Sequence, residues 1–395
     1  MFKRFTSLFI TLLFLSSCIC LTGCKNEENV FPELHFADES VTANDPGSGD
    51  IQSVNSDLHE ITVALPLSDR TVNLLMKLYY AKNHDLFPSD MSGADISIEY
   101  LDAINTPWVV NTITTTGTGE TSDIIESLSQ DGIVPDVFLA SDLGDMVSNG
   151  LAAPLDGYLA SDMNISASTV YLGALDALRS GEEHYGIPFC STVYMLAGSS
   201  EYVPESGVPA YNISSDDLLD YLQDIPGTSS DGSLSVTRFY DAGSLALFMG
   251  ADYADSIDSY GLSSVTDSYG ADPRVSRSCG MWLMNSSEFD TWSYYYPDGL
   301  YFVMLPSENV NAVVYPLCLS PMSSDPAFAS GFASFICFDK DAQMLMRRLE
   351  SLRGYFPPVA NRGVWDVMSS DSEFGTQVML YEQYMDNAVY TAAED

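Results

Sequence analysis

Short apolar strands alternate with amphipathic helices along the first part of the chain. Residues 59–66, HEITVALP, place an apolar side chain at every second position, which predicts a strand. A helix with Ser68 as its N-cap is predicted to follow, and residues 94–102 are predicted as a second strand. Residues 122–132 then predict a second helix and residues 135–140 a third strand. This alternation predicts an α/β fold with mainly parallel sheets flanked by helices.

The later part of the chain continues with both kinds of element, without a sequence repeat. Residues 278–285 predict a buried strand, and residues 286–296 predict a capped helix directly after it. The remaining predicted elements are helices at 214–225, 244–249, 325–338, 340–352 and 373–390, and strands at 300–306 and 311–321.

The N-terminus has the pattern of a secretory signal. Lys3 and Arg4 precede the apolar run Phe5–Leu21, which is short for a membrane-spanning helix. The run ends in Leu21-Thr22-Gly23-Cys24, which resembles the lipobox of bacterial lipoproteins. That resemblance implies removal of residues 1–23 and a diacylglycerol on the Cys24 thiol; the alternative is an ordinary signal peptide with a chance cysteine. Residues 24–57 are polar and acidic and are predicted to be a flexible tether.

The charge of the chain excludes some partners. The formal net charge is -40, from 15 Lys and Arg against 55 Asp and Glu. Such a surface repels nucleic acid and anionic lipid, so we expect no nucleic-acid partner and membrane attachment only through the lipid. The cysteines beyond the tether lack the CxxC spacing typical of zinc sites, so no metal is expected.

Signals for an enzyme are weak. The chain has four histidines and none of the motifs HExxH, GxSxG or SxxK. Its many carboxylates would permit a glycosidase pair, but no spacing singles one out. We therefore predict no catalytic residues and no cofactor.

Several segments resemble the extracellular solute-binding proteins, family 1, of bacterial ABC importers, a group that includes maltodextrin-binding proteins. Residues 124–159 carry the strongest likeness, with Pro135-Asp136 before an apolar strand and Asp142 after it. Tyr185-Gly-Ile-Pro188 and the apolar run after it resemble the family's first crossover strand. Residues 303–321 resemble the second crossover, and residues 324–359 resemble the late helices and the third crossover. The chain departs from the family at Ala197-Gly198-Ser199, where the family has Tyr-Asn-Lys, and over residues 238–277.

The resemblance implies a periplasmic-binding-protein-like fold of two lobes with a ligand cleft at a three-stranded hinge. One lobe would comprise residues 58–188 and 313–354, and the other residues 189–312 and 355–395. Such a protein is expected to be a monomer on the outer face of the cytoplasmic membrane. It would close about its hinge on a carbohydrate, in the simplest case an oligosaccharide, and deliver it to permease subunits. Polyamines, peptides and other small solutes remain open as ligands. A tethered glycan hydrolase or an adhesion lipoprotein would be an alternative of another class.

Candidate binding residues follow the strands that the resemblance places at the cleft. Asp142 lies just past a strand end, where its carboxylate could accept bonds from sugar hydroxyls; it could equally cap the next helix, as could Ser141. Asp69 occupies the equivalent loop after the first strand. Thr192 and Tyr194 lie on the first crossover, and Tyr194 could stack on a sugar or simply pack at the hinge.

The remaining candidates lie further along the chain. Ser286 and Ser287 are predicted at a strand-to-helix turn, with Trp292 on the helix after it, although a chance aromatic cluster is also possible. Tyr315 lies on the returning strand. Arg353 and Tyr355 flank Gly354 at the third crossover, and a surface salt bridge is the simpler role for Arg353. Because Cys190 and Cys318 fall on crossover strands, a disulfide between them is a further hypothesis.

Overall fold

The structure, a computed structural model, describes most of the chain beyond the predicted tether. Described are residues 58–393 except 89–94, 116–120, 161, 163–164, 166–169, 211, 231, 233–234, 241–244, 246–271, 297–298, 306–309, 350–381, 383–384 and 387. The predicted signal, Cys24, the tether and most of the predicted helices at 244–249 and 373–390 lie outside these residues.

Three parallel strands form the first part of the sheet. β1 (Glu60–Leu65) lies between β2 (Val109–Thr114) and β3 (Val137–Leu139). Helix α2 (Asp69–Asn83) begins directly after β1, where the Ser68 hydroxyl accepts a hydrogen bond from the backbone N–H of Thr71 at 3.3 Å. The predicted first and third strands and the predicted Ser68 cap are therefore confirmed.

The predicted second strand at residues 94–102 is wrong. Ser97 instead caps helix α3 (Ile98–Ala103) by accepting a hydrogen bond from the N–H of Tyr100 at 3.0 Å. The alternation of Ile96, Ile98 and Tyr100 imitated a strand, but the hydroxyl three residues before a free N–H stabilises a helical first turn. The second strand is β2, which follows Trp108.

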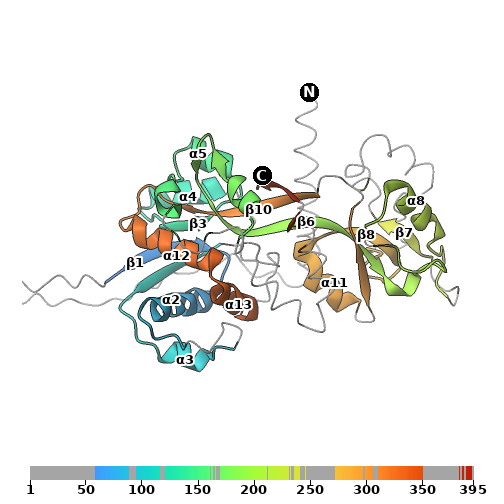
Figure 1. The fold of residues 1–395 in the computed structure, drawn as a ribbon, viewed down its shortest axis with the longest axis horizontal. Helices are drawn as coiled ribbons and strands as arrows, with labels where there is room; N and C mark the ends of the chain where they lie inside the picture. The colour runs from blue at the N-terminus through green and yellow to red at the C-terminus, as the bar shows by residue number, and fades with distance from the viewer. Residues whose placement is uncertain are drawn as a thin grey trace, which may run out of the picture. The chain divides into compact units, whose positions relative to one another are not determined.

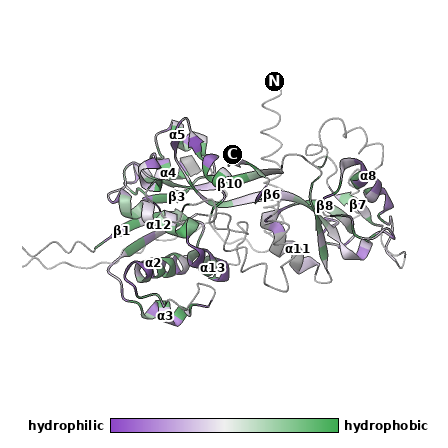
Figure 2. Cartoon of the chain, in the orientation of Figure 1, coloured by the Kyte–Doolittle hydropathy of each residue, from purple (hydrophilic) through white to green (hydrophobic). Residues whose placement is uncertain are grey.

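Helices cover this part of the sheet (Figure 1). After α4 (Thr121–Gln130) come three short helices, α5 (Leu143–Ser148), α6 (Asp156–Leu159) and α7 (Leu172–Asp176). The late helices α12 (Pro326–Phe338) and α13 (Lys340–Leu349) pack against α2 and against each other. Lys82 on α2 binds Asp339 at 2.7 Å and Asp341 at 2.5 Å, which fixes the start of α13. Figure 2 shows β1 and β3 coloured as hydrophobic and α13 largely as hydrophilic, as expected for a buried sheet with solvated helices.

Two long strands connect this part of the sheet to a second part. β10 (Val310–Leu319) pairs antiparallel with β3 and with β6 (Ile187–Ser199). β6 pairs with β10 up to Val193 and with β8 (Cys279–Asn285) from Tyr194 onward. The one strand β6 is therefore shared by both parts, and it belongs to a nine-stranded hydrogen-bonded sheet with every other described strand except β4 and β5.

The second part of the sheet is smaller. It adds β7 (Thr237–Tyr240), parallel to β8, and β9 (Leu300–Val303), antiparallel to β6. Around it lie α8 (Ser215–Asp224), α11 (Phe289–Tyr295) and two 3₁₀ turns, η1 (Ser200–Tyr202) and η2 (Ser286–Glu288). The strand predicted at 278–285 and the helices predicted at 214–225 and 286–296 are confirmed, but the predicted cap of the last helix is wrong, because α11 begins after η2 and its N-cap Glu288 makes no side-chain cap hydrogen bond.

Alternate residues of β6 enter two different apolar clusters. Met195 and Ala197 join the larger cluster, which also holds Trp282, whereas Leu196 joins a smaller cluster with Leu218 of α8. This is the expected result of a strand buried on both faces, because successive side chains point to opposite sides of the sheet.

The chain ends in a strand where the sequence predicted the end of a helix. β11 (Ala388–Ala392) pairs in parallel with β10, register Val310 opposite Ala388. Its alternation of half-buried and exposed residues follows from a strand with one covered face, because successive side chains point to opposite sides of the sheet. A two-stranded hairpin, β4 (Arg179–Ser180) with β5 (Glu183–His184), precedes β6.

The α/β fold class is confirmed: β2–β1–β3, β7–β8 and β10–β11 pair in parallel, whereas β6 pairs antiparallel with β8, β9 and β10, and β10 pairs antiparallel with β3. The division into lobes at residues 188, 312 and 354 stays a prediction. Within the described residues, none of the helices has the length and apolar character needed to cross a bilayer.

The proposed Cys190–Cys318 disulfide is wrong. Both thiols are free and buried, as are those of Cys279 and Cys337. The strand register explains this, because it places Cys190 opposite Tyr315 and Cys318 opposite Phe138. Burial raises the pKa of the Cys190 and Cys318 thiols, so both are protonated at neutral pH.

A glycine on β6 leaves room for a tyrosine ring of β9 to pack directly against the β6 backbone. Gly198 pairs with Tyr301 of β9, whose hydroxyl forms a buried 2.8 Å hydrogen bond with the hydroxyl of Tyr221. A Cβ at Gly198 would overlap the Tyr301 ring, whereas a Cβ at Gly157 of α6 would meet no heavy atom within 4 Å.

We therefore expect Gly198→Ala to lower the free energy of unfolding by about 1–3 kcal/mol, because an overpacked site must push the Tyr301 ring away. Gly157→Ala, the matched control, should leave stability unchanged or raise it, since alanine favours a helix. Urea denaturation followed by circular dichroism measures both variants. Equal stability of the two would contradict this packing.

Candidate ligand-binding site

Polar residues gather where β1 and β3 end. Ser68 and Asp69 follow β1, and Ser141 and Asp142 follow β3. Because these strands are parallel neighbours, their carboxyl ends meet at one edge of the sheet, the edge at which α/β sheets bind ligands. Asp69 accepts a hydrogen bond from the Thr112 hydroxyl of β2, so a third strand contributes to the same edge.

Asp142 caps a helix with one carboxylate oxygen only. It is the N-cap of α5, and its Oδ1 accepts a hydrogen bond from the N–H of Asp145 at 2.8 Å. Oδ2 has no hydrogen-bond partner among the described residues, and the side chain is half-buried. The capping role is thus confirmed, and the second oxygen is left over for a hydroxyl donor.

The crossing strands continue from this edge. The N–H of Ala140 donates to the carbonyl of Pro316 at 2.9 Å, which brings the end of β3, and hence Ser141, against β10. On β10 and β6, Tyr315 lies opposite Cys190 and Val313 opposite Thr192. Residues that face each other across a sheet share a side, so Tyr315 and Thr192 lie on one face of the crossing strands. Tyr315 is half-buried and Thr192 is buried.

Tyr194 extends this face into the second part of the sheet. It is paired with Asn285 at the end of β8, and the two side chains are hydrogen-bonded. Burial raises the pKa of the Tyr194 phenol, so the hydroxyl keeps its proton at neutral pH and can both donate and accept.

Ser286 and Ser287 differ in what the structure shows. The Ser286 hydroxyl is buried and accepts a hydrogen bond from the backbone N–H of Val193 at 3.1 Å, so it fastens η2 to β6. The side chain of Ser287 lies outside the described residues, as do Arg353 and Tyr355.

Trp292 lies on the other face of the second part of the sheet from Tyr194. Its ring meets that of Trp282 edge to face, with centroids 5.6 Å apart, and Trp282 points away from the face of Tyr194 and Asn285. Only 5% of Trp292 is exposed, and the guanidinium carbon of Arg274 lies 4.5 Å from its ring centroid. The Trp292 ring is therefore covered by Arg274 and Trp282, and little of its surface is accessible to a sugar.

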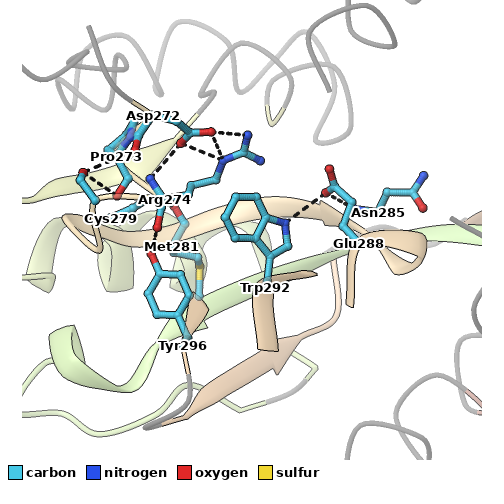
Figure 3. A network of polar contacts seen from close by, with 10 residues as sticks. Asp272, Pro273, Arg274, Cys279, Met281, Asn285, Glu288, Trp292 and Tyr296 are labelled. Carbon is cyan, nitrogen blue, oxygen red and sulfur yellow. Dashed lines mark hydrogen bonds and ion pairs between the residues drawn. The ribbon is translucent and has the colours of Figure 1, made fainter. Parts of the chain in front are cut away.

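A network of polar contacts surrounds Trp292 (Figure 3). Arg274 binds Asp272 with two N–H groups, at 3.0 and 2.7 Å, and lies between the rings of Trp292 and Tyr240. Burial opposes the Arg274 charge, but Asp272 and Glu288 outweigh it and raise the Arg274 pKa. The Glu288 carboxylate accepts a hydrogen bond from Trp292 Nε1 at 3.4 Å.

The residues of this network were missed at the sequence level, apart from Trp292. Tyr240, Asp272 and Arg274 belong to the segment 238–277, which the resemblance left unmatched. One signal was available: basic residues are scarce in this acidic chain, so a lone arginine beside an aspartate is expected to be paired.

The histidines with acidic partners are structural. His184 donates from Nδ1 to Asp156 at 2.8 Å and accepts at Nε2 from Arg179 Nε at 3.0 Å, so both ring nitrogens are occupied. His59 contacts Asp325 at 2.6 Å and stacks on Phe328. The partners in these contacts are carboxylates, a guanidinium and an aromatic ring, and not the hydroxyl or thiol that a histidine activates in a nucleophilic enzyme.

Comparison with known proteins shows the fold but no relative in sequence. No family model matches the chain, and no curated protein matches it in sequence. Among solved structures, a family 1 extracellular solute-binding protein from Alicyclobacillus acidocaldarius superposes with a TM-score of 0.57 at 12% identity, covering 86% of this chain and 89% of the other. An ABC substrate-binding protein from Listeria monocytogenes, solved with cycloalternan, gives 0.58 at 14% identity, covering 85% and 88%.

A third structure, the cyclic α-maltosyl-1,6-maltose binding protein of Arthrobacter globiformis, gives 0.54 at 12% identity and covers 85% of this chain and 88% of the other. At such identities a likeness establishes the fold alone. The resemblance predicted from the sequence is confirmed at that level, and the chain has the two-lobed α/β fold of the extracellular solute-binding proteins.

Proposed function

We propose that this chain is an extracytoplasmic solute-binding protein that captures an oligosaccharide for an ABC importer. The observation that carries this proposal is that Tyr315, Thr192 and Tyr194 share one face of the strands that join the two parts of the fold, and that Asp142 follows β3, whose end lies against β10. Structures of the same fold are described as bound to cycloalternan or to maltotetraose, which supports a carbohydrate as ligand.

The chemistry of these residues suits a polyol. The open oxygen of Asp142 accepts hydrogen bonds, the protonated phenol of Tyr194 both donates and accepts, and Tyr315 adds a further hydroxyl group. Asp69 adds an acceptor at the same edge of the sheet. Ser141, Ser287, Arg353 and Tyr355 remain proposed contacts.

Function follows from closure rather than from chemistry on the ligand. A solute that touches both lobes binds the closed form more tightly, so its binding shifts the population towards closure. Permease subunits would recognise that closed form. We propose no bond-breaking step and no cofactor.

Binding is tested with the purified protein in a thermal-shift screen of maltotetraose, cellotetraose, mannotetraose, spermidine and a tripeptide. A tetrasaccharide at a hundredfold its Kd should add about 2.7 kcal/mol of stability. Asp142→Ala should lose about 1 kcal/mol of stability through the cap as well as sugar affinity, whereas Asp142→Asn should keep the cap and lose affinity alone. A thermal shift with spermidine alone would mean that the ligand is a polyamine and not a sugar. Unchanged sugar affinity of Asp142→Asn would show that Asp142 does not bind the ligand.

We propose further that Cys24 carries a lipid that anchors the protein to the outer face of the cytoplasmic membrane. The lipobox-like Leu21-Thr22-Gly23-Cys24 supports this, and residues 24–57 would span the distance from the bilayer. Wild-type protein expressed in a bacterium should partition into the detergent phase of Triton X-114, and Cys24→Ser should not. Equal partitioning of the two would refute the anchor.

A further inference from the structure

We infer that Glu288 is a ligand-binding residue that presents one carboxylate oxygen to a hydroxyl of a neutral saccharide, and that Trp292 positions it. This inference rests on the proposed function, and it adds a residue and a preference of ligand charge to that function.

Glu288 is held by one oxygen and open at the other. It lies in η2 directly after β8, and its Oε2 accepts hydrogen bonds from Trp292 Nε1 and from the backbone N–H of Asn285, both at 3.4 Å. Oε1 has no partner among the described residues, and Figure 3 shows it pointing away from both donors. Both donors occupy Oε2, so Oε1 is the oxygen that is left to accept a further hydrogen bond.

Glu288 adjoins the proposed binding face. Asn285 is paired with Tyr194 of β6 and hydrogen-bonded to its side chain, and Ser286 binds the neighbouring Val193 N–H. The charge of Glu288 reaches the Tyr194 hydroxyl, whose pKa it helps burial to raise. Glu288 thus connects the face of Tyr194 with the network around Trp292.

The negative charge of Glu288 disfavours anionic ligands. Arg274 is already matched by the two-pronged ion pair with Asp272, so the Glu288 charge is left without an ion pair of its own among the described residues. A uronate or sulfated saccharide would meet this negative charge, whereas a neutral saccharide donates a hydroxyl to it.

Trp292 acts through its N–H. Arg274 covers one side of its ring and Trp282 meets it edge-on, so the indole does not stack on a ligand. Its Nε1 is the side-chain donor that orients Glu288. Trp292, named from the sequence as a candidate ligand contact, is therefore assigned as a positioning residue.

The test compares Glu288→Gln with Glu205→Gln, a control with the same charge change at an exposed site. Calorimetric titration with maltotetraose, cellotetraose and mannotetraose should show a 10- to 100-fold higher Kd for Glu288→Gln and no change for Glu205→Gln, because a hydrogen bond to a charged group is lost. Glu288→Asp keeps the charge but has a shorter side chain that withdraws the carboxylate, so its affinity for the tetrasaccharides should also fall at least tenfold. Circular dichroism checks that each variant is folded.

Two further readouts separate binding from mere support of the fold. In Glu288→Gln, the ratio of the Kd for tetragalacturonate to the Kd for cellotetraose should fall at least fivefold. Loss of a purely structural residue would leave this ratio unchanged. Trp292→Phe should weaken binding less than Glu288→Gln, and the double variant should be no weaker than Glu288→Gln alone, since both changes act on one contact.

The outcomes are distinct. Wild-type affinity for the tetrasaccharides in a folded Glu288→Gln protein, with its selectivity unchanged, overturns the assignment of Glu288 and leaves the proposed function standing. If the wild-type protein binds none of the saccharides, both the proposed function and the assignment of Glu288 are overturned.

Discussion

The pairing of a single strand with two different partners is the constraint on which the rest of the fold depends. β6 pairs with β10 up to Val193 and with β8 from Tyr194, so one continuous backbone belongs to both parts of the sheet. Its thirteen residues are almost all buried, because both faces of the strand are covered: Met195 and Ala197 join the larger apolar cluster and Leu196 the smaller one. Any motion between the two parts must bend this strand or its neighbour β10, and Thr192 and Tyr194, both proposed as ligand contacts, flank the change of partner.

The close approach at Gly198 and the bond from Val193 to Ser286 are both consequences of this constraint. A strand that is buried on both faces has no room for error in side-chain size, which is why a glycine is required where Tyr301 crosses. The Ser286 hydroxyl satisfies a backbone N–H at the point where ladder pairing with β10 ends and pairing with β8 begins. These polar details fix where the strand changes partner.

Much of the fold could be predicted because strand periodicity and capping residues are local signals. Residues 59–66 and the Ser68 cap were predicted correctly because alternation and a cap are both written in adjacent residues. Residues 94–102 were mispredicted because the same alternation can occur at the start of a helix, and only the Ser97 hydroxyl decides between them. β11 was mispredicted because its pairing with β10 is a contact between segments about eighty residues apart.

The candidate site could be predicted where it follows strand ends or lies on the crossover strands. Asp142 was found because a polar residue after a buried strand lies at a known edge of the sheet. The Cys190–Cys318 pairing failed because it needs a register that sequence does not give. Arg274 and Glu288 were missed because their roles depend on partners in other elements, Tyr240 and Trp292 among them.

The central claim is that the two parts joined by β6 close on a saccharide, and a distance measurement between them tests it most directly. Spin labels at Ser148→Cys of α5 and Asp220→Cys of α8, both exposed, can be attached in a protein expressed without residues 1–24, because the four remaining thiols, from Cys190 onward, are buried. Double electron–electron resonance should show a shorter and narrower distance distribution when the best-bound tetrasaccharide is added. An unchanged distribution at saturating tetrasaccharide would contradict closure.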